Sequence, residues 1–248
     1  MIDDTDELAA TWPAGYRAAV CPVILFDAPT VARSGGPAIG LDYAPSGFNR
    51  LLSVMADLDL MATVGVTPAA ERFAPTLVAK ATAMKLDVVG WSSNKESLDS
   101  DPEVPDGSLF RGTRGHVAGL PHHPAVTSLS ADIAWIIDGS GGDKPTLRGE
   151  TCLIPTSPYW VDSVWLDPCR PLPPSSLLEA WSLSLAGVRT QGALMTVLLH
   201  AELSGRIGIS GQIMRFLDEV IESGDVWITS AAQIATWWRE EAFNQGQE

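Results

Sequence analysis

The chain has 248 residues with a formal net charge of −14, and 46% of its residues are hydrophobic, with nine tryptophans among them. This composition is typical of a packed globule and excludes an intrinsically disordered chain. There are 30 acidic residues against 16 basic ones, and Lys and Arg form no cluster, so the basic face of a nucleic-acid or anionic-membrane binder is missing. We therefore expect neither a nucleic-acid partner nor a membrane partner.

The start of the chain and its cysteines predict a cytoplasmic protein. Residues 1–7 are acidic and lack the basic and apolar regions of a signal peptide. The longest apolar runs, Ala18–Phe26 and Ala193–Leu199, are too short to span a bilayer. Because Cys21, Cys152 and Cys169 show no CxxC spacing, we expect reduced thiols and no zinc module.

Along the chain, apolar β-branched segments alternate with longer segments of helical periodicity. The predicted strands are Ala18–Phe26, Met61–Thr67, Leu86–Val89, Ile133–Ile137, Cys152–Ile154, Ala193–Leu199 and Val226–Thr229. The predicted helices are Ser46–Leu58, Ala69–Met84, Leu177–Ala186, Ser210–Glu222 and Ala231–Phe243. Pro68 marks the start of the second helix, and Ser230 with Gln233 three residues later forms a capping-box pattern before the last one.

This alternation predicts an α/β fold in which parallel strands are joined by helices. Seven strands favour a distorted (β/α) barrel formed by a single domain over residues 1–248, and an open, doubly wound sheet is the alternative. The segment Ser97–Pro124 is rich in Asp, Pro, Gly and Arg, and we expect it to be an irregular loop at one end of the barrel.

Short motifs spread over nearly the whole chain resemble those of one superfamily. They are WPAG at 12–15, GFNRLL at 47–52, ATV at 62–64, AERFAP at 70–75, GWS at 90–92 and LHAELSGR at 199–206. In this order they resemble the polysaccharide-deacetylase (NodB-homology, carbohydrate-esterase-4-like) superfamily, in its cytoplasmic branch of allantoinase-like and cyclic-imide-hydrolase-like proteins. The resemblance implies a NodB-like barrel and hydrolysis of C–N bonds other than peptide bonds.

The positions that hold a metal ion in that superfamily differ in this chain. The superfamily has an FDD motif after its first strand and an HxxxH pair later, whereas this chain has Ala28 at the second Asp and no His in residues 88–94. Trp91 or its neighbour and Ser93 stand where the His pair would be, and Val117 stands near the position of a motif arginine. Since a catalytic metal needs about three protein ligands, we expect neither a metal nor another cofactor.

Two residues remain as candidates for acid–base catalysis. Asp27 directly follows the first strand, and the resemblance implies that it is the general base. His200 follows an apolar strand, and the resemblance implies that it is the general acid. Glu202 lies two residues further on, so on a continuing strand it would share the face of His200 and orient the imidazole. The structural alternatives are a turn or cap residue before Pro29 for Asp27, and a histidine with only a structural role for His200.

Further residues are candidates for the walls of a substrate pocket. Trp91 would fill the space left by the metal, beside Ser93. Tyr159, Trp160 and Asp162 follow the strand that ends near Ile154, and the two aromatic residues either line a pocket or pack in the core.

The other three histidines, His116, His122 and His123, match no metal-binding spacing, so we interpret them as solvated loop residues and not as metal ligands.

Two functions agree with these observations. The first is a metal-independent enzyme acting on a small organic molecule, by hydrolysis of an amide or cyclic amide, or by isomerisation, cyclisation or dehydration. The second is a non-catalytic protein on the same fold that binds a small molecule or a partner. For either function the expected partners are a small molecule and further copies of the chain in a homo-oligomer. Retention of Asp27 and His200 favours the enzyme, and loss of the metal positions favours the binding protein.

Overall fold

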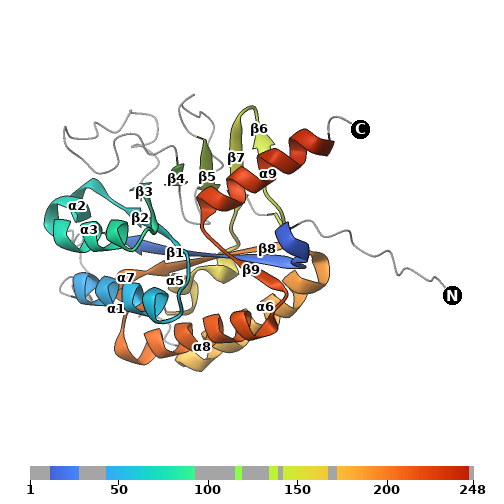
Figure 1. Ribbon diagram of the computed structural model, residues 1–248. Helices are drawn as coiled ribbons and strands as arrows, with labels where there is room; N and C mark the ends of the chain where they lie inside the picture. The colour runs from blue at the N-terminus through green and yellow to red at the C-terminus, as the bar shows by residue number, and fades with distance from the viewer. Residues whose placement is uncertain are drawn as a thin grey trace.

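The computed structural model describes residues 12–27, 43–92, 115–118, 134–138, 142–166 and 172–245 (Figure 1). Their strands form one sheet in the order β6-β7-β5-β4-β3-β2-β1-β8, and β9 also pairs with β1. The strands are β1 (Ala18–Phe26), β2 (Thr63–Val66), β3 (Asp87–Ser92), β4 (Gly115–Ala118), β5 (Trp135–Asp138), β6 (Thr146–Arg148), β7 (Thr151–Pro155), β8 (Leu194–His200) and β9 (Val226–Ile228).

The helices follow the predicted order, with additional short ones. They are α1 (Ala44–Asp57), α2 (Pro68–Phe73), α3 (Pro75–Ala83), α5 (Asp162–Trp165), α6 (Pro174–Gln191), α7 (Ala201–Ser204), α8 (Ile207–Ser223) and α9 (Ala231–Gln245), with 3-10 turns η1 (Pro13–Gly15) and η2 (Pro158–Trp160). The single helix predicted at Ala69–Met84 is two helices. Pro75 begins the second one, and Ala74 before it has a non-helical backbone, as expected for a residue that precedes proline.

The expected α/β fold with parallel strands is confirmed, but the barrel is not closed. Every strand pair is parallel except β6–β7, which is antiparallel. In the described residues the hydrogen-bonded ladder stops between β7 and β8, where an isolated bridge joins Val161 to Leu198. The described residues form nine strands and not about seven, because β4 and β6 were not predicted. β4 lies within Ser97–Pro124, which is therefore not irregular throughout.

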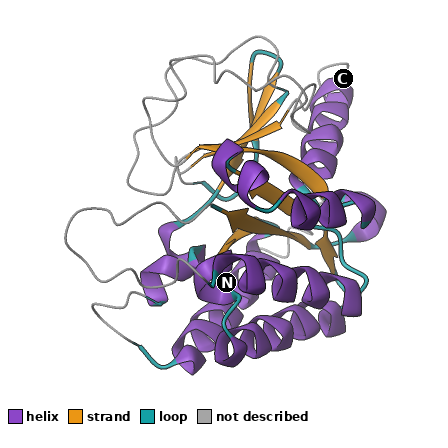
Figure 2. Cartoon of the chain, turned by 90° about the vertical axis from the view of Figure 1, so that its left-hand side faces the viewer, coloured by secondary structure: helices purple, strands orange, loops and turns teal. Residues whose placement is uncertain are grey.

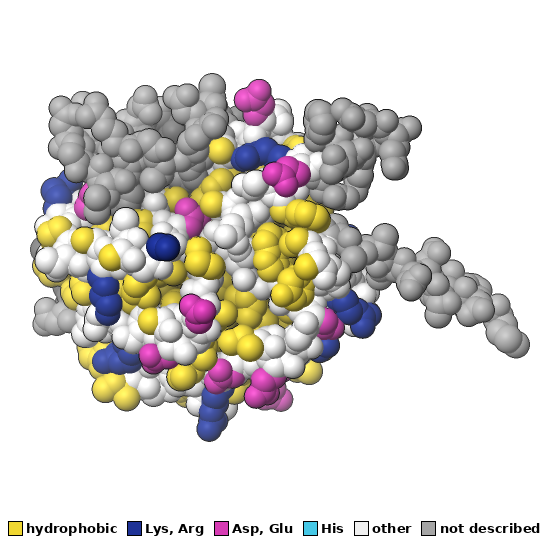
Figure 3. Space-filling view, viewed as in Figure 1, with side chains coloured by type: hydrophobic (Ala, Val, Ile, Leu, Met, Phe, Trp, Pro, Cys, Tyr) yellow, Lys and Arg dark blue, Asp and Glu magenta, His cyan; other side chains and the backbone are white. Residues whose placement is uncertain are grey.

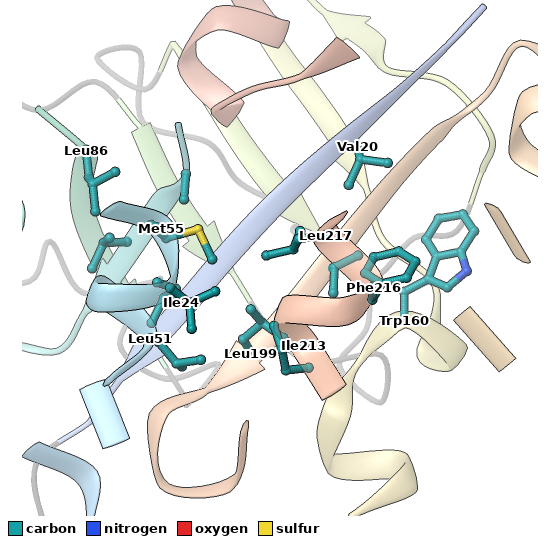
Figure 4. Close-up of a cluster of buried hydrophobic side chains, with 14 of the residues drawn as sticks. Val20, Ile24, Leu51, Met55, Leu86, Trp160, Leu199, Ile213, Phe216 and Leu217 are labelled. Carbon is teal, nitrogen blue, oxygen red and sulfur yellow. The ribbon is translucent and has the colours of Figure 1, made fainter. Parts of the chain in front are cut away.

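Side chains of β1 alternate between two apolar layers. Val20, Ile24 and Phe26 belong to the layer between the sheet and the helices, part of which Figure 4 shows with Phe216 of α8. Figure 1 places α1, α6 and α8 along the same side of the sheet, and the turned view of Figure 2 shows helices gathered on that side. The alternate β1 residues face the second, inner layer, which α9 covers. This inner layer is the one that leads to the candidate site.

Lys and Arg side chains lie singly among acidic ones on the face shown in Figure 3. Among the described residues, no helix combines the length and the apolar character needed to cross a membrane.

Candidate active site

The candidate residues meet where β1 and β8 end at their carboxyl edge. β8 runs parallel to β1 with Leu25 opposite His200, and Asp27 comes two residues after Leu25. Because side chains alternate along a strand, Leu25 and Asp27 share a face, and this is the inner face of the sheet. Carboxyl ends of parallel strands are where α/β folds gather their functional groups.

A buried carboxylate fixes the imidazole of His200. Asp162 is 0% exposed, and its Oδ1 lies 2.5 Å from Nδ1 of His200. Its Oδ2 accepts a hydrogen bond of 2.7 Å from the backbone N–H of His200. His200 as a whole residue is 5% exposed. Since Nδ1 is engaged by Asp162, Nε2 is the nitrogen that remains for proton transfer.

The surroundings of His200 favour its protonated form. Burial lowers the pKa of His200, because it disfavours the charged imidazolium. The charge and hydrogen bond of Asp162 raise this pKa, and the charges of Glu202 and Asp27 act in the same direction. The net pKa lies above the ordinary value of histidine, which suits a group that donates a proton near neutral pH.

Asp27 is held at one oxygen by Thr67. The hydroxyl of Thr67 donates a hydrogen bond of 2.7 Å to Oδ1 of Asp27. The same hydroxyl oxygen accepts a 3.1 Å hydrogen bond from the backbone N–H of Ala70, and so caps the start of α2. The carboxylate is thereby tied to the start of a helix that Pro68 begins, as the sequence predicts.

Trp91 and Glu202 lie close to the His200 ring. The indole of Trp91 meets the imidazole edge-on, with 6.0 Å between ring centroids and 71° between planes. Glu202 follows in the first turn of α7. Burial raises the pKa of Glu202, the charge of His200 lowers it, and the charges of Asp162 and Asp27 add to the rise.

Several predicted contacts are different in the structure. Asp162, not Glu202, orients the imidazole, and it is buried behind the ring instead of lining a pocket. Trp160 packs in the apolar layer near Phe216 (Figure 4), so it belongs to the core and not to a pocket wall. Tyr159 is 65% exposed, while its backbone carbonyl accepts hydrogen bonds from two indoles of neighbouring helices.

The remaining candidates cannot be placed at the site. The backbone of His116 lies in β4, which corrects the prediction of a loop for that residue. Ser93, His122 and His123 lie outside the described residues.

The described residues do not fit a metal ion. Val89 on β3, within the stretch where the superfamily has its histidine pair, is buried in the inner apolar layer with Trp91. Ala28 lies outside the described residues, but its side chain offers no ligand atom. No group of three or more His, Cys, Asp or Glu side chains that could hold a metal occurs in the described part of the chain.

Two residues of the site were not predicted from the sequence. Thr67 carries a signal, since a threonine directly before a proline that opens a helix is a typical cap. Ser204 donates a hydrogen bond of 2.7 Å to Oδ2 of Asp162. Its only sequence signal is its position four residues after His200, one helical turn away.

Comparison with known proteins shows which solved structures share this fold. No family model matches the chain, and no curated protein matches it. A protein from Mycobacterium smegmatis that carries the name polysaccharide deacetylase is 19% identical, with a TM-score of 0.76 and 93% of both chains covered. One with the same name from Pseudomonas aeruginosa PAO1 is 14% identical, with a TM-score of 0.77 and 94% of both chains covered.

The structure of Puue allantoinase is also 14% identical, with a TM-score of 0.73 over 93% of both chains. At these identities the match establishes the fold. The chain therefore has the fold that these polysaccharide-deacetylase and allantoinase structures share.

Proposed function

We propose that this protein is a metal-independent enzyme that hydrolyses an amide or cyclic amide of a small organic molecule. The observation that carries the proposal is the His200–Asp162 pair at the carboxyl edge of β8, beside Asp27 at the end of β1. A buried imidazole fixed by a carboxylate, next to a second carboxylate, is an arrangement suited to general acid–base catalysis.

In the proposed reaction Asp27 removes a proton from water as the water oxygen forms a bond to the carbonyl carbon. The C–N bond then breaks, and His200 gives its Nε2 proton to the departing nitrogen. A second proton transfer, from Asp27 to the imidazole by way of solvent, restores both groups. Without a metal, an N–H donor must stabilise the oxyanion, and the indole of Trp91 or a nearby backbone amide is our candidate.

Two kinds of observation support hydrolysis over other acid–base reactions. The fold is shared with structures named as polysaccharide deacetylases and as an allantoinase, names that describe removal of an acetyl group and action on allantoin, which contains a cyclic amide. Because the pKa of His200 is raised, the imidazole carries a proton that it can donate to the departing nitrogen, which is a poor leaving group without protonation. Isomerisation, cyclisation or dehydration would use the same acid and base on a different substrate.

The second candidate function is ligand binding without turnover. It is favoured by the buried residues Val89 and Trp91 on β3, which give this side of the site an apolar surface in place of polar metal ligands. It predicts that small amides bind and are recovered unchanged.

A substrate panel tests the proposal. The purified protein is dialysed against EDTA and incubated with allantoin, hydantoin, dihydrouracil, succinimide and N-acetylated sugars, and the products are followed by mass spectrometry. We expect ring opening or deacetylation of at least one class, unchanged after chelation and absent in Asp27→Asn. Turnover that appears only after a metal is added would contradict metal independence, and binding without turnover would favour the second candidate.

A further inference from the structure

The carboxylate of Asp162 accepts more hydrogen bonds than the imidazole alone supplies. Oδ1 is engaged by Nδ1 of His200, and Oδ2 accepts from both the backbone N–H of His200 and the hydroxyl of Ser204. Ser204 and Asp162 are both 0% exposed. A serine hydroxyl that donates to a buried carboxylate takes up part of its negative charge.

We propose that Ser204 is a positioning residue that sets how firmly Asp162 holds the imidazole of His200. α7 begins directly after His200 and ends at Ser204, so one helical turn brings both donors onto the same carboxylate. Among the described residues, the Ser204 hydroxyl donates to Asp162 and not to the imidazole, so it acts through Asp162. Its importance for catalysis rests on the proposed function, although its effect on the imidazole does not.

A merely structural role for Ser204 is the alternative, in which its hydroxyl only anchors α7. The backbone packing of α7 argues against this. A Cβ atom added at Gly47 of α1 would lie 2.0 Å from the carbonyl oxygen of Ala201. One added at Gly205 would lie 2.3 Å from Cα of Gly47. α7 is therefore held directly against α1 by close backbone contact, which does not depend on the Ser204 hydroxyl.

The charged groups that act on His200 give the sign of the effect. They are Asp162 from α5, Glu202 from α7 and Asp27 directly after β1, and all three carboxylates raise the pKa of the imidazole. Loss of the Ser204 donor leaves more negative charge on Asp162, so the imidazolium is held more firmly. The titration of His200 should then move to higher pH.

The experiment is an NMR titration of the histidine side chains in the full-length protein. The chain has four histidines, and the His200 signals are assigned by their absence in His200→Ala. In Ser204→Ala we expect the His200 midpoint to shift to higher pH with the Nδ1–H tautomer retained. Ser204→Cys keeps the branching of the side chain, with a larger sulfur atom and a weaker donor, so it should shift the midpoint in the same direction by less.

Ser210→Ala is the matched control. Ser210 is also buried, but its hydroxyl donates to the carbonyl of Ile207 in α8, and we expect no shift of the His200 midpoint. An unchanged midpoint in folded Ser204→Ala, a shift to lower pH, or loss of folding in both Ser204 variants would overturn the proposal. Because no substrate is needed, this result is independent of whether the protein hydrolyses any member of the panel.

Discussion

Two aspartates with little exposure to solvent, Asp162 and Asp87, have different roles in the structure. Asp162 lies at the carboxyl ends of the strands, and Asp87 lies at their amino ends. Asp162 engages the imidazole of His200 at the carboxyl edge. Asp87 begins β3, and its Oδ2 accepts hydrogen bonds of 3.2 Å from the hydroxyl of Thr63 and from the backbone N–H of Ala232 in α9. One carboxylate holds a group that can transfer a proton, and the other holds the start of a helix.

The comparison teaches that burial of a carboxylate does not by itself mark a functional site. Burial raises the pKa of Asp87, and the hydrogen bonds from Ala232 and Thr63 lower it in part. None of these partners titrates near neutral pH, so we assign Asp87 a structural role. The partner of Asp162 is a histidine, whose charge changes in the physiological range.

The largest expected effect is on turnover, at the candidate acid and base. Asp27→Asn and His200→Ala should each lower kcat by about 10²- to 10⁴-fold, as is typical when a general base or acid is removed. The double variant should be little worse than either single one, because residues that act as a unit are not additive. Steady-state kinetics on the substrate found in the panel measure this, and full activity in either variant would exclude an acid–base pair.

The next prediction contrasts the two aspartates directly. Asp162→Asn should reduce turnover on the order of 10²-fold, because the amide carries no charge to support protonation of His200. Asp87→Asn should leave turnover within about twofold, since its contacts are far from the carboxyl edge. Parallel kinetics on the two variants check this. Equal losses in both would mean that the two carboxylates do not differ in the way we describe.

The structural role of Asp87 is tested on stability. Asp87→Ala should lower the free energy of unfolding by about 1–3 kcal/mol, because a largely shielded backbone N–H of α9 and the hydroxyl of Thr63 lose their acceptor. Chemical denaturation measures the loss. Thr236→Ala, at an exposed position on α9 where the hydroxyl donates to a backbone carbonyl of the same helix, is the control and should change stability by less than about 0.5 kcal/mol.

A smaller effect concerns pH. The pKa of Asp87 is raised in the folded protein, so the folded state favours the protonated carboxyl. The stabilisation linked to this proton is complete below the ordinary aspartate pKa and is lost as the pH rises through the raised value. The free energy of unfolding of the wild type, compared with that of Asp87→Asn at the same pH, should therefore decrease from acidic to neutral pH. A difference that is constant with pH would show that Asp87 titrates normally.

The parts of the fold that follow local patterns were predictable. The apolar run Ala18–Phe26 is β1 with the same bounds, and Pro68 starts α2. The predicted cap of α9 is present, since the hydroxyl of Ser230 accepts a hydrogen bond from the backbone N–H of Gln233. In these segments the sequence-local signals and the tertiary packing agree.

The remaining features depend on contacts that a local pattern does not contain. β6 is three residues long and all three are exposed, so it has no alternation of buried apolar side chains. Asp162 lies 38 residues before His200, and only the approach of α5 to the end of β8 brings them together. The sequence therefore predicted Glu202, the nearer carboxylate along the chain, as the group that orients the imidazole.

The central claim is that Asp162 holds the imidazole of His200 and keeps it protonated despite burial. The direct measurement is an NMR titration of His200 in the wild type and in Asp162→Asn. In the wild type we predict a pKa above the ordinary value of histidine and an Nδ1–H tautomer at high pH. In Asp162→Asn the pKa of His200 should fall below the wild-type value. Burial still lowers this pKa, and the negative charge of Asp162 that raises it is gone. The same midpoint in both proteins would contradict the account.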